Sequence, residues 1–170
     1  MLRSIKEYKI QDVKAFKTRL LYWSQQFEEV MWLDSNQHSD TYSNYDAILA
    51  VDAFTLIKTD DQDGFEKLKE YQEQTSDWIF GYLAYDLKND VENLHSGNYD
   101  GLKFPDLYFF QPKKIFLLKG DCLQIAYLPL VDDEIEDDFE QILTFSDKIS
   151  YSDLDNSPCG RVKILSLIHI

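Results

Sequence analysis

The stretch "TDDQDGFEKLKE" carries several side-chain oxygens at spacings that could bind a metal ion. Asp61, Asp63, Gly64 and Glu70 match the third, fifth, sixth and twelfth positions of a calcium-binding EF-hand loop. The first position of that loop is a threonine without a carboxylate, and the residues before it are typical of a strand, whereas an EF-hand requires a helix there. We therefore predict that these residues form a polar turn that caps a helix.

The remaining side chains that could do chemistry occur singly or in one acidic run. The run Asp132–Asp138 would need a fold to converge its oxygens on a metal, so we interpret it as an exposed helix face. Ser35 lies in no Gly-x-Ser-x-Gly sequence, and the chain has no glycine-rich phosphate loop. The motifs alone predict no catalytic residue and no metal site. The isolated histidines and cysteines, at no ligand or disulfide spacing, are His38, His95, His169, Cys122 and Cys159.

The composition is that of an acidic globular protein. The chain has 170 residues, of which 44% are hydrophobic and 15% aromatic, and its formal net charge is −14. This charge repels phosphates and anionic lipids, so we expect neither nucleic acid nor a membrane surface as a partner. The sequence shows no signal peptide and no apolar run long enough to span a bilayer, which predicts a cytoplasmic protein.

The N-terminal third predicts one helix and two strands. Six apolar residues between Val13 and Val30 recur at intervals of three and four, which indicates one helix face that packs on a sheet. A strand is predicted over Val30–Leu33. The run from Tyr45 to Thr59 is apolar on both faces, which predicts a central strand covered on both sides. The six residues of the helix face are Val13, Phe16, Leu20, Trp23, Phe27 and Val30.

The middle of the chain predicts a helix between two strands and then a hairpin. The helix runs from Asp63 to Gln74, with Phe65 and Leu68 facing inward. A strand "DWIFGYLAYDL" follows, and its glycine, Gly81, allows a neighbouring backbone or ring to approach closely. The strand "FPDLYFF" then leads into a hairpin whose turn is Lys119-Gly120-Asp121. The aromatic residues expected to fill the space around Gly81 are Trp78, Phe80, Tyr82 and Tyr85.

The fold class that follows is α+β with a mostly antiparallel sheet and a few flanking helices. An acidic helix begins near Asp132, which could cap it, and a polar linker follows. We therefore expect a domain over residues 1–130, an acidic helix and linker over 131–161, and a non-native tail over 162–170. The apolar residues at helical spacing are Ile135, Phe139, Ile142 and Leu143.

Three segments resemble the N-terminal region of chorismate-utilising enzymes. They are "VMWLDSNQHSDTYSNYDAILAVDAFTLI", "FGYLAYDLKNDVENL" and "LKFPDLYFFQPKKIFLL", and the pairing of "GYLAYDL" with "FPD" is the most specific part. The family includes component I of aminodeoxychorismate synthase and of anthranilate synthase. The pattern is closer to the aminodeoxychorismate (para-aminobenzoate synthase) branch, because the N-terminal region of this chain is short and compact.

The resemblance implies part of a two-sheet sandwich and a catalytic half that lies further along the polypeptide. That half would hold magnesium and aminate chorismate for para-aminobenzoate and folate synthesis, with ammonia from a glutamine amidotransferase subunit. None of its motifs occurs here, so we expect this chain to be inactive alone. Two alternatives stay open: a fragment of anthranilate synthase component I, which serves tryptophan biosynthesis, or a free-standing small-molecule-binding domain.

The resemblance also implies a pocket that binds tryptophan or a related ligand. Leu33 and Ser35 would share one face of a strand, because strand side chains alternate. Asn44 stands where an arginine is frequent in the family, and "KND" after the Tyr-Asp pair departs from the usual basic residues. A strand-end hydroxyl that satisfies a backbone group is an equally good interpretation of Ser35. The pocket residues implied are Leu33, Ser35, Tyr42, Ser43, Asn44 and Tyr45.

Overall fold

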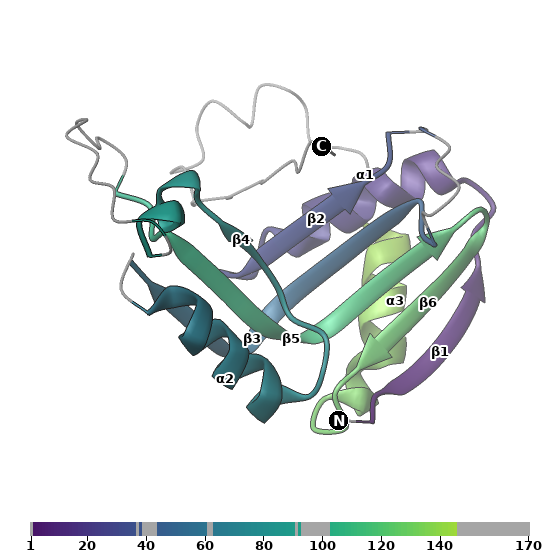
Figure 1. The fold of residues 1–170 in the computed structure, drawn as a ribbon. Coiled ribbons are helices and arrows are strands. Elements are labelled where there is room, and N and C mark those ends of the chain that lie inside the picture. Colours follow the sequence, from purple (N-terminus) through teal and green to yellow (C-terminus); the bar gives the residue numbers. More distant parts are fainter. Residues whose placement is uncertain are drawn as a thin grey trace. The chain divides into compact units, whose positions relative to one another are not determined.

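The computed structural model describes residues 2–36, 38, 44–60, 63–90, 92 and 103–145. Within them the strands follow the hydrogen-bonded order β1-β6-β5-β3-β2, and β4 pairs with β5 outside this path (Figure 1). With its helices, the chain is α+β with a mostly antiparallel six-stranded sheet, as predicted. It divides into two compact units: unit 1 is the continuous segment Ala53–Pro112, and unit 2 combines Leu2–Asp52 with the chain from Lys113 onward.

Unit 2 is built on antiparallel pairs of strands. β1 pairs with β6 from Ser4↔Tyr127 to Lys9↔Cys122, and β6 also pairs with β5. The turn between β5 and β6 is where the sequence predicted it, and Gly120 adopts a φ of 57°, which favours glycine. Its elements are β1 (Ser4–Lys9), α1 (Val13–Ser24), β2 (Val30–Asp34), β6 (Cys122–Tyr127), the 3-10 turn η2 (Asp132–Glu134), α3 (Ile135–Thr144), and parts of β3 (Ala47–Thr59) and β5 (Leu107–Lys119).

The core of unit 2 lies between the strands and the two helices α1 and α3. Phe16 and Leu20 of α1 and Ile135 and Ile142 of α3 are each about 1% exposed or less, in one cluster with residues of β3, β5 and β6. In α3, the predicted apolar residue Leu143 is instead 43% exposed. The burial of so many large side chains is the main source of stability in this unit.

Helix α1 ends at Ser24, earlier than the apolar spacing predicted. Polar side chains bind carbonyls of its last turn: Ser24 Oγ donates to Leu21 O at 2.7 Å, and Gln26 Nε2 donates to Trp23 O at 2.9 Å. These bonds satisfy groups that a helix end leaves without partners. Phe27 and Val30, the last two residues of the predicted helix face, still pack on the core, but they lie outside the helix.

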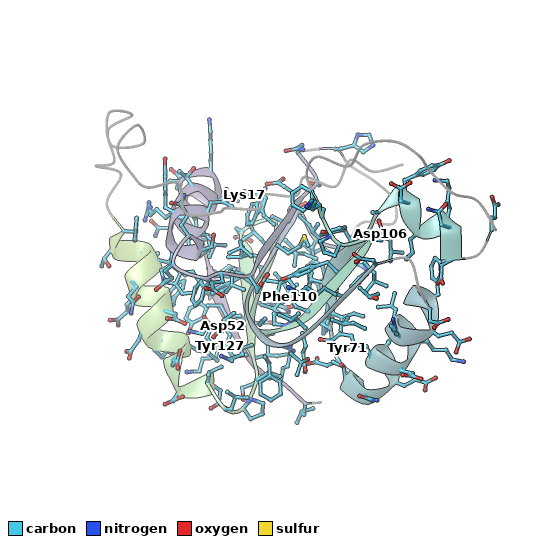
Figure 2. The ribbon with its side chains drawn as sticks, turned by 90° about the vertical axis from the view of Figure 1, so that its left-hand side faces the viewer. Lys17, Asp52, Tyr71, Asp106, Phe110 and Tyr127 are labelled. Atoms are coloured by element: carbon cyan, nitrogen blue, oxygen red, sulfur yellow. The ribbon has the colours of Figure 1, made fainter. Side chains whose placement is uncertain are left out.

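Unit 1 contains α2 (Gly64–Thr75), β4 (Phe80–Leu83), the 3-10 helix η1 (Tyr85–Asp90), and the remaining parts of β3 and β5. The Tyr71 hydroxyl attaches α2 to the strands (Figure 2). It donates to Thr55 O at 3.0 Å and accepts the Gln111 N–H at 3.0 Å. Gln111 Nε2 also donates to Asp77 at 2.8 Å, so the polar groups between helix and strands have partners.

Several side chains of unit 1 are exposed where the sequence predicted burial. Phe54 and Leu56 of β3 are each 45% exposed, so coverage on both faces holds only for the first part of that strand. Phe65 was expected to face inward but is exposed on α2, a helix whose only buried residue is Gly64. The predicted long strand around Gly81 is four residues long, and Trp78 and Tyr85 lie outside it with their rings exposed.

The capping residues also differ from those predicted. The N-terminus of α2 is capped by Asp90, whose carboxylate accepts the Asp63 N–H at 2.8 Å and the Phe65 N–H at 3.2 Å. Asp132 makes no side-chain cap and instead accepts the hydroxyl of Ser4 at 2.5 Å. Both contacts join residues far apart in the sequence, which local patterns do not reveal. The linker from residue 146 and the tail over 162–170 lie outside the described residues.

Candidate functional site

A hollow of about 300 Å³ opens in unit 2 beside the hairpin of β5 and β6. Across this hairpin Leu117 pairs with Gln124, and Lys119 pairs with Cys122. Paired residues of neighbouring strands project to the same face of a sheet. The alternate residues of β5, Phe116 and Leu118, project to the opposite face and belong to the core cluster. The hollow therefore lies on the face opposite the core. It is lined by Asn44, Tyr45, Leu117, Lys119, Cys122 and Gln124.

Two residues of the predicted pocket, Asn44 and Tyr45, line this hollow. Leu33 is in register with Ile48, and its neighbour Trp32 packs on the core, so Leu33 projects to the same face as the hollow. Ser35 N donates to Asp46 O at 2.9 Å, which holds the end of β2 next to the segment with Asn44 and Tyr45. Leu33 and Ser35 are not among the six lining residues, and Tyr42 and Ser43 lie outside the described residues.

The side chains of the hollow can bind a small molecule but offer no usual pair for acid–base catalysis. Leu117 provides an apolar wall, and Lys119 an ammonium group. The Gln124 amide donates to Glu7 at 2.8 Å, which fixes its orientation. The six lining residues include neither a histidine nor a carboxylate, the side chains that most often act as general bases. The sequence did not predict Leu117, Lys119, Cys122 or Gln124, because strand pairing alone brings them here.

A second polar constellation in unit 2 surrounds Lys114, which is only 3% exposed. Its Nζ donates to Asp138 at 2.5 Å and to Glu134 at 2.6 Å. Tyr127 points from β6 toward α3 (Figure 2), and its hydroxyl donates to Asp138 at 2.8 Å. These four residues join β5, β6, η2 and α3.

The electrostatics of this cluster keep the lysine charged. Burial by itself lowers the pKa of Lys114, but the hydrogen bonds and charges of Asp138 and Glu134 outweigh burial, so the pKa is raised. Burial first, and then the charge of Asp138, raises the pKa of the Tyr127 hydroxyl far above its ordinary value. A protonated amine cannot act as a nucleophile or base, so we assign the cluster a structural role.

Aromatic rings complete the surroundings of the Lys114 ammonium group. Its Nζ lies 5.8 Å from the ring centroid of Trp23, 5.6 Å from that of Phe27 and 5.2 Å from that of Tyr127. Contacts at these distances contribute a cation–π attraction, which is larger for a desolvated cation. Sequence reasoning missed this cluster, although Lys114 has the same strand phase as the core residues Phe116 and Leu118.

In unit 1 the two segments "GYLAYDL" and "FPDLYFF" lie side by side. β4 pairs with β5 from Phe80↔Phe110 to Leu83↔Leu107, and Ala84 N donates to Asp106 O at 2.7 Å. A Cβ at Gly81 would overlap the carbonyl oxygen of Tyr108 and lie 2.6 Å from the Cα of its cross-strand partner Phe109. The close approach predicted from this glycine is therefore confirmed for both backbone and ring, because the Cγ of Phe109 would lie 2.5 Å from the added Cβ.

Comparisons with protein-family models and with curated proteins found no match for this chain. Among the described residues, no three histidine, cysteine or carboxylate side chains are grouped closely enough to hold a metal ion. No helix within the described part of the chain is both long and apolar enough to cross a membrane.

Proposed function

We propose that this chain is the non-catalytic N-terminal region of a chorismate-utilising enzyme, on the aminodeoxychorismate synthase component I branch. The observation that carries the proposal is the pairing of β4 with β5. It places the most specific segments of the resemblance in register, around a glycine that no larger residue could replace without moving backbone. Because each segment packs against the backbone of the other, a change in one would disturb the other, which explains why the two segments occur together.

The hollow in unit 2 supports a binding role for this region. Asn44 and Tyr45, which the resemblance assigns to a tryptophan-like pocket, line it together with residues of β5 and β6. Leu117 can contact the face of a planar ring, while Lys119 can bind a carboxylate. Because the hollow is open to one side, the catalytic half of the parent enzyme would supply the missing wall. We expect weak binding by this chain alone.

The rest of the function would belong to the parent enzyme. Its catalytic half would bind magnesium and chorismate, and a glutamine amidotransferase subunit would deliver ammonia in the cytoplasm. The anthranilate synthase branch, whose product differs, stays the alternative. Sequencing the gene beyond the codon for Arg161 tests the family directly. We expect an open frame that encodes a chorismate-binding half, and a stop codon at the end of this chain would contradict the proposal.

A tryptophan titration followed by amide NMR tests the binding role. We expect saturable shifts at Leu33, Ser35, Asn44 and Tyr45 and around the hairpin. The resemblance implies that Ser35 binds the ligand, so Ser35→Ala should weaken binding by about 1 kcal/mol, or roughly fivefold, the typical size of one hydrogen bond. Thr18→Ala, which removes an exposed hydroxyl on α1, is the matched control and should leave the affinity unchanged. Shifts confined to other residues would contradict this position of the pocket, and no shifts at millimolar ligand would contradict binding by this chain.

A further inference from the structure

We propose that the free edge of β3 over Ala53–Thr59 binds an extended segment of a partner protein, which adds one strand to the sheet. In this mode of recognition, main-chain hydrogen bonds provide affinity and alternate side chains provide specificity. The proposed site lies in unit 1, and the proposal does not depend on the chorismate-enzyme assignment.

Among the described residues this edge has no strand partner, because β2 is shorter than β3. The register of β2 ends at Val30↔Val51, and one more bond joins Asp52 N to Glu29 O at 3.2 Å. Apart from β2, the only strand that pairs with β3 among the described residues is β5. Within this part of the chain no strand pairs with the other side of Ala53–Thr59, so a further strand could bind its N–H and C=O groups there.

The side chains along this edge define what the added strand should carry. Phe54 and Leu56, each 45% exposed, project to one face. Thr55 projects to the other face, where its Oγ1 lies 2.8 Å from the hydroxyl of Tyr71 on α2. An added strand with apolar residues at alternate positions would lay them beside Phe54 and Leu56, because cross-strand neighbours on one face contact each other.

The strand β1, at the other end of the strand order, has an edge whose side chains oppose pairing with another chain. β1 has the sequence "SIKEYK", in which three charged residues discourage pairing with another chain. The segment Ala53–Thr59 has the sequence "AFTLIKT", in which Lys58 is the only charge. Both segments are at least partly exposed. They differ in the number of charged side chains that would oppose pairing, which is three in β1 and one in Ala53–Thr59.

Charge selects a basic segment over a second copy of this chain. The described residues of unit 1 include ten acidic and five basic side chains, and the whole chain carries −14. A second copy would bring the same negative charge, whereas lysines or arginines that flank an apolar strand would be attracted. The expected partner segment therefore alternates apolar and small polar residues between basic ends.

The test uses the ¹⁵N-labelled chain and the acetylated peptide Lys-Thr-Val-Thr-Val-Thr-Val-Lys. We expect saturable amide shifts over Ala53–Thr59 at about millimolar peptide, since a short unstructured peptide must be ordered on binding. A peptide with glutamates in place of the lysines should bind about fivefold more weakly, and high salt should reduce this difference. The shifts should also be absent from β1.

Variants locate the site. Leu56→Lys places a charge on the open edge and should weaken peptide binding about tenfold. Leu56→Thr, which keeps a strand-forming residue, should have a smaller effect and guards against loss of folding. Ile5→Lys on β1, where Ile5 is 61% exposed, is the matched control and should bind normally. The proposal is overturned by shifts that centre elsewhere, by no saturable shift, or by concentration-dependent shifts of this edge without peptide, which would indicate a second copy.

Discussion

Units 1 and 2 treat their apolar side chains differently. Unit 2 collects Phe16, Leu20, Ile135 and many others into one buried cluster and closes it with a buried ion pair. Unit 1 leaves large apolar side chains such as Phe54, Leu56 and Trp78 about 45% exposed. Unit 2 also exposes single apolar side chains, such as Ile5 and Leu143, but most of its large apolar side chains lie in the core cluster. In unit 1, Phe54 and Leu56 lie two residues apart on one strand and leave apolar surface for binding.

The largest effect should come from breaking the closed cluster of unit 2. Asp138→Ala leaves the ammonium of Lys114 buried without its closest carboxylate, which should cost about 3 to 5 kcal/mol of unfolding free energy. Urea unfolding followed by circular dichroism measures this loss. Asp137→Ala, at an exposed position one residue earlier, is the matched control and should change the unfolding free energy by no more than about 0.5 kcal/mol.

A double variant sharpens the same point. Lys114→Met combined with Asp138→Leu removes both buried charges, and it should recover most of the stability, because apolar residues often replace buried ion pairs without loss. If Asp138→Ala alone cost less than about 1 kcal/mol, the pair would behave like an exposed salt bridge. The contrast between a closed and an open unit would then rest on apolar packing only.

The next effect belongs to unit 1. Gly81→Ala forces β4 away from the backbone of Tyr108 and Phe109, which should cost about 1 to 3 kcal/mol, the usual range for overpacking. Hydrogen exchange should show faster opening of β4 and its partner residues in β5, with unit 2 unchanged. Gly120→Asn is the control, because a Cβ there meets open space and asparagine tolerates a positive φ. Equal exchange in wild type and Gly81→Ala would refute the close backbone contact.

The smallest effect is a pH dependence in unit 2. Burial first, and then the hydrogen bond to Glu136, raises the pKa of Tyr8 from 10.0 to about 12. Because the folded-state pKa lies above the unfolded one, the stabilisation is complete below pH 10 and is lost as the pH rises toward about 12. Melting temperatures across this window should fall less steeply in Tyr8→Phe, which keeps the ring stacked 3.9 Å from Phe139. An identical slope in both proteins would contradict the assignment.

Local patterns in the sequence predicted the helices, the hairpin turn and every strand except β1, but not where these elements end. The apolar stripe of α1 continued past Ser24 because Phe27 contacts the same core from outside the helix. Periodicity reports which side chains are buried and not which backbone groups are bonded. The strand β1 was missed because its residues are mostly polar and its pairing partner, β6, lies more than a hundred residues further on.

Of the residues that line the hollow, the sequence predicted only those that are adjacent along the chain. Asn44 and Tyr45 were identified, whereas Lys119 and Gln124 join them only through the register of β5 and β6. The Lys114 cluster was missed for the same reason, since its carboxylates are 20 and 24 residues away. The role of Leu33 and Ser35 in ligand binding stays a prediction.

The order of the chain through the two units has a consequence for biosynthesis. Unit 1 is continuous, whereas unit 2 begins before it and ends after it, with β1 hydrogen-bonded to β6. On a ribosome that adds about 5 to 20 residues per second, unit 1 would be complete a few seconds before β6 and α3 emerge. The nascent strand β1 must wait for a partner made more than a hundred residues later. Closing so long a loop makes the pairing of β1 with β6 a late step in folding.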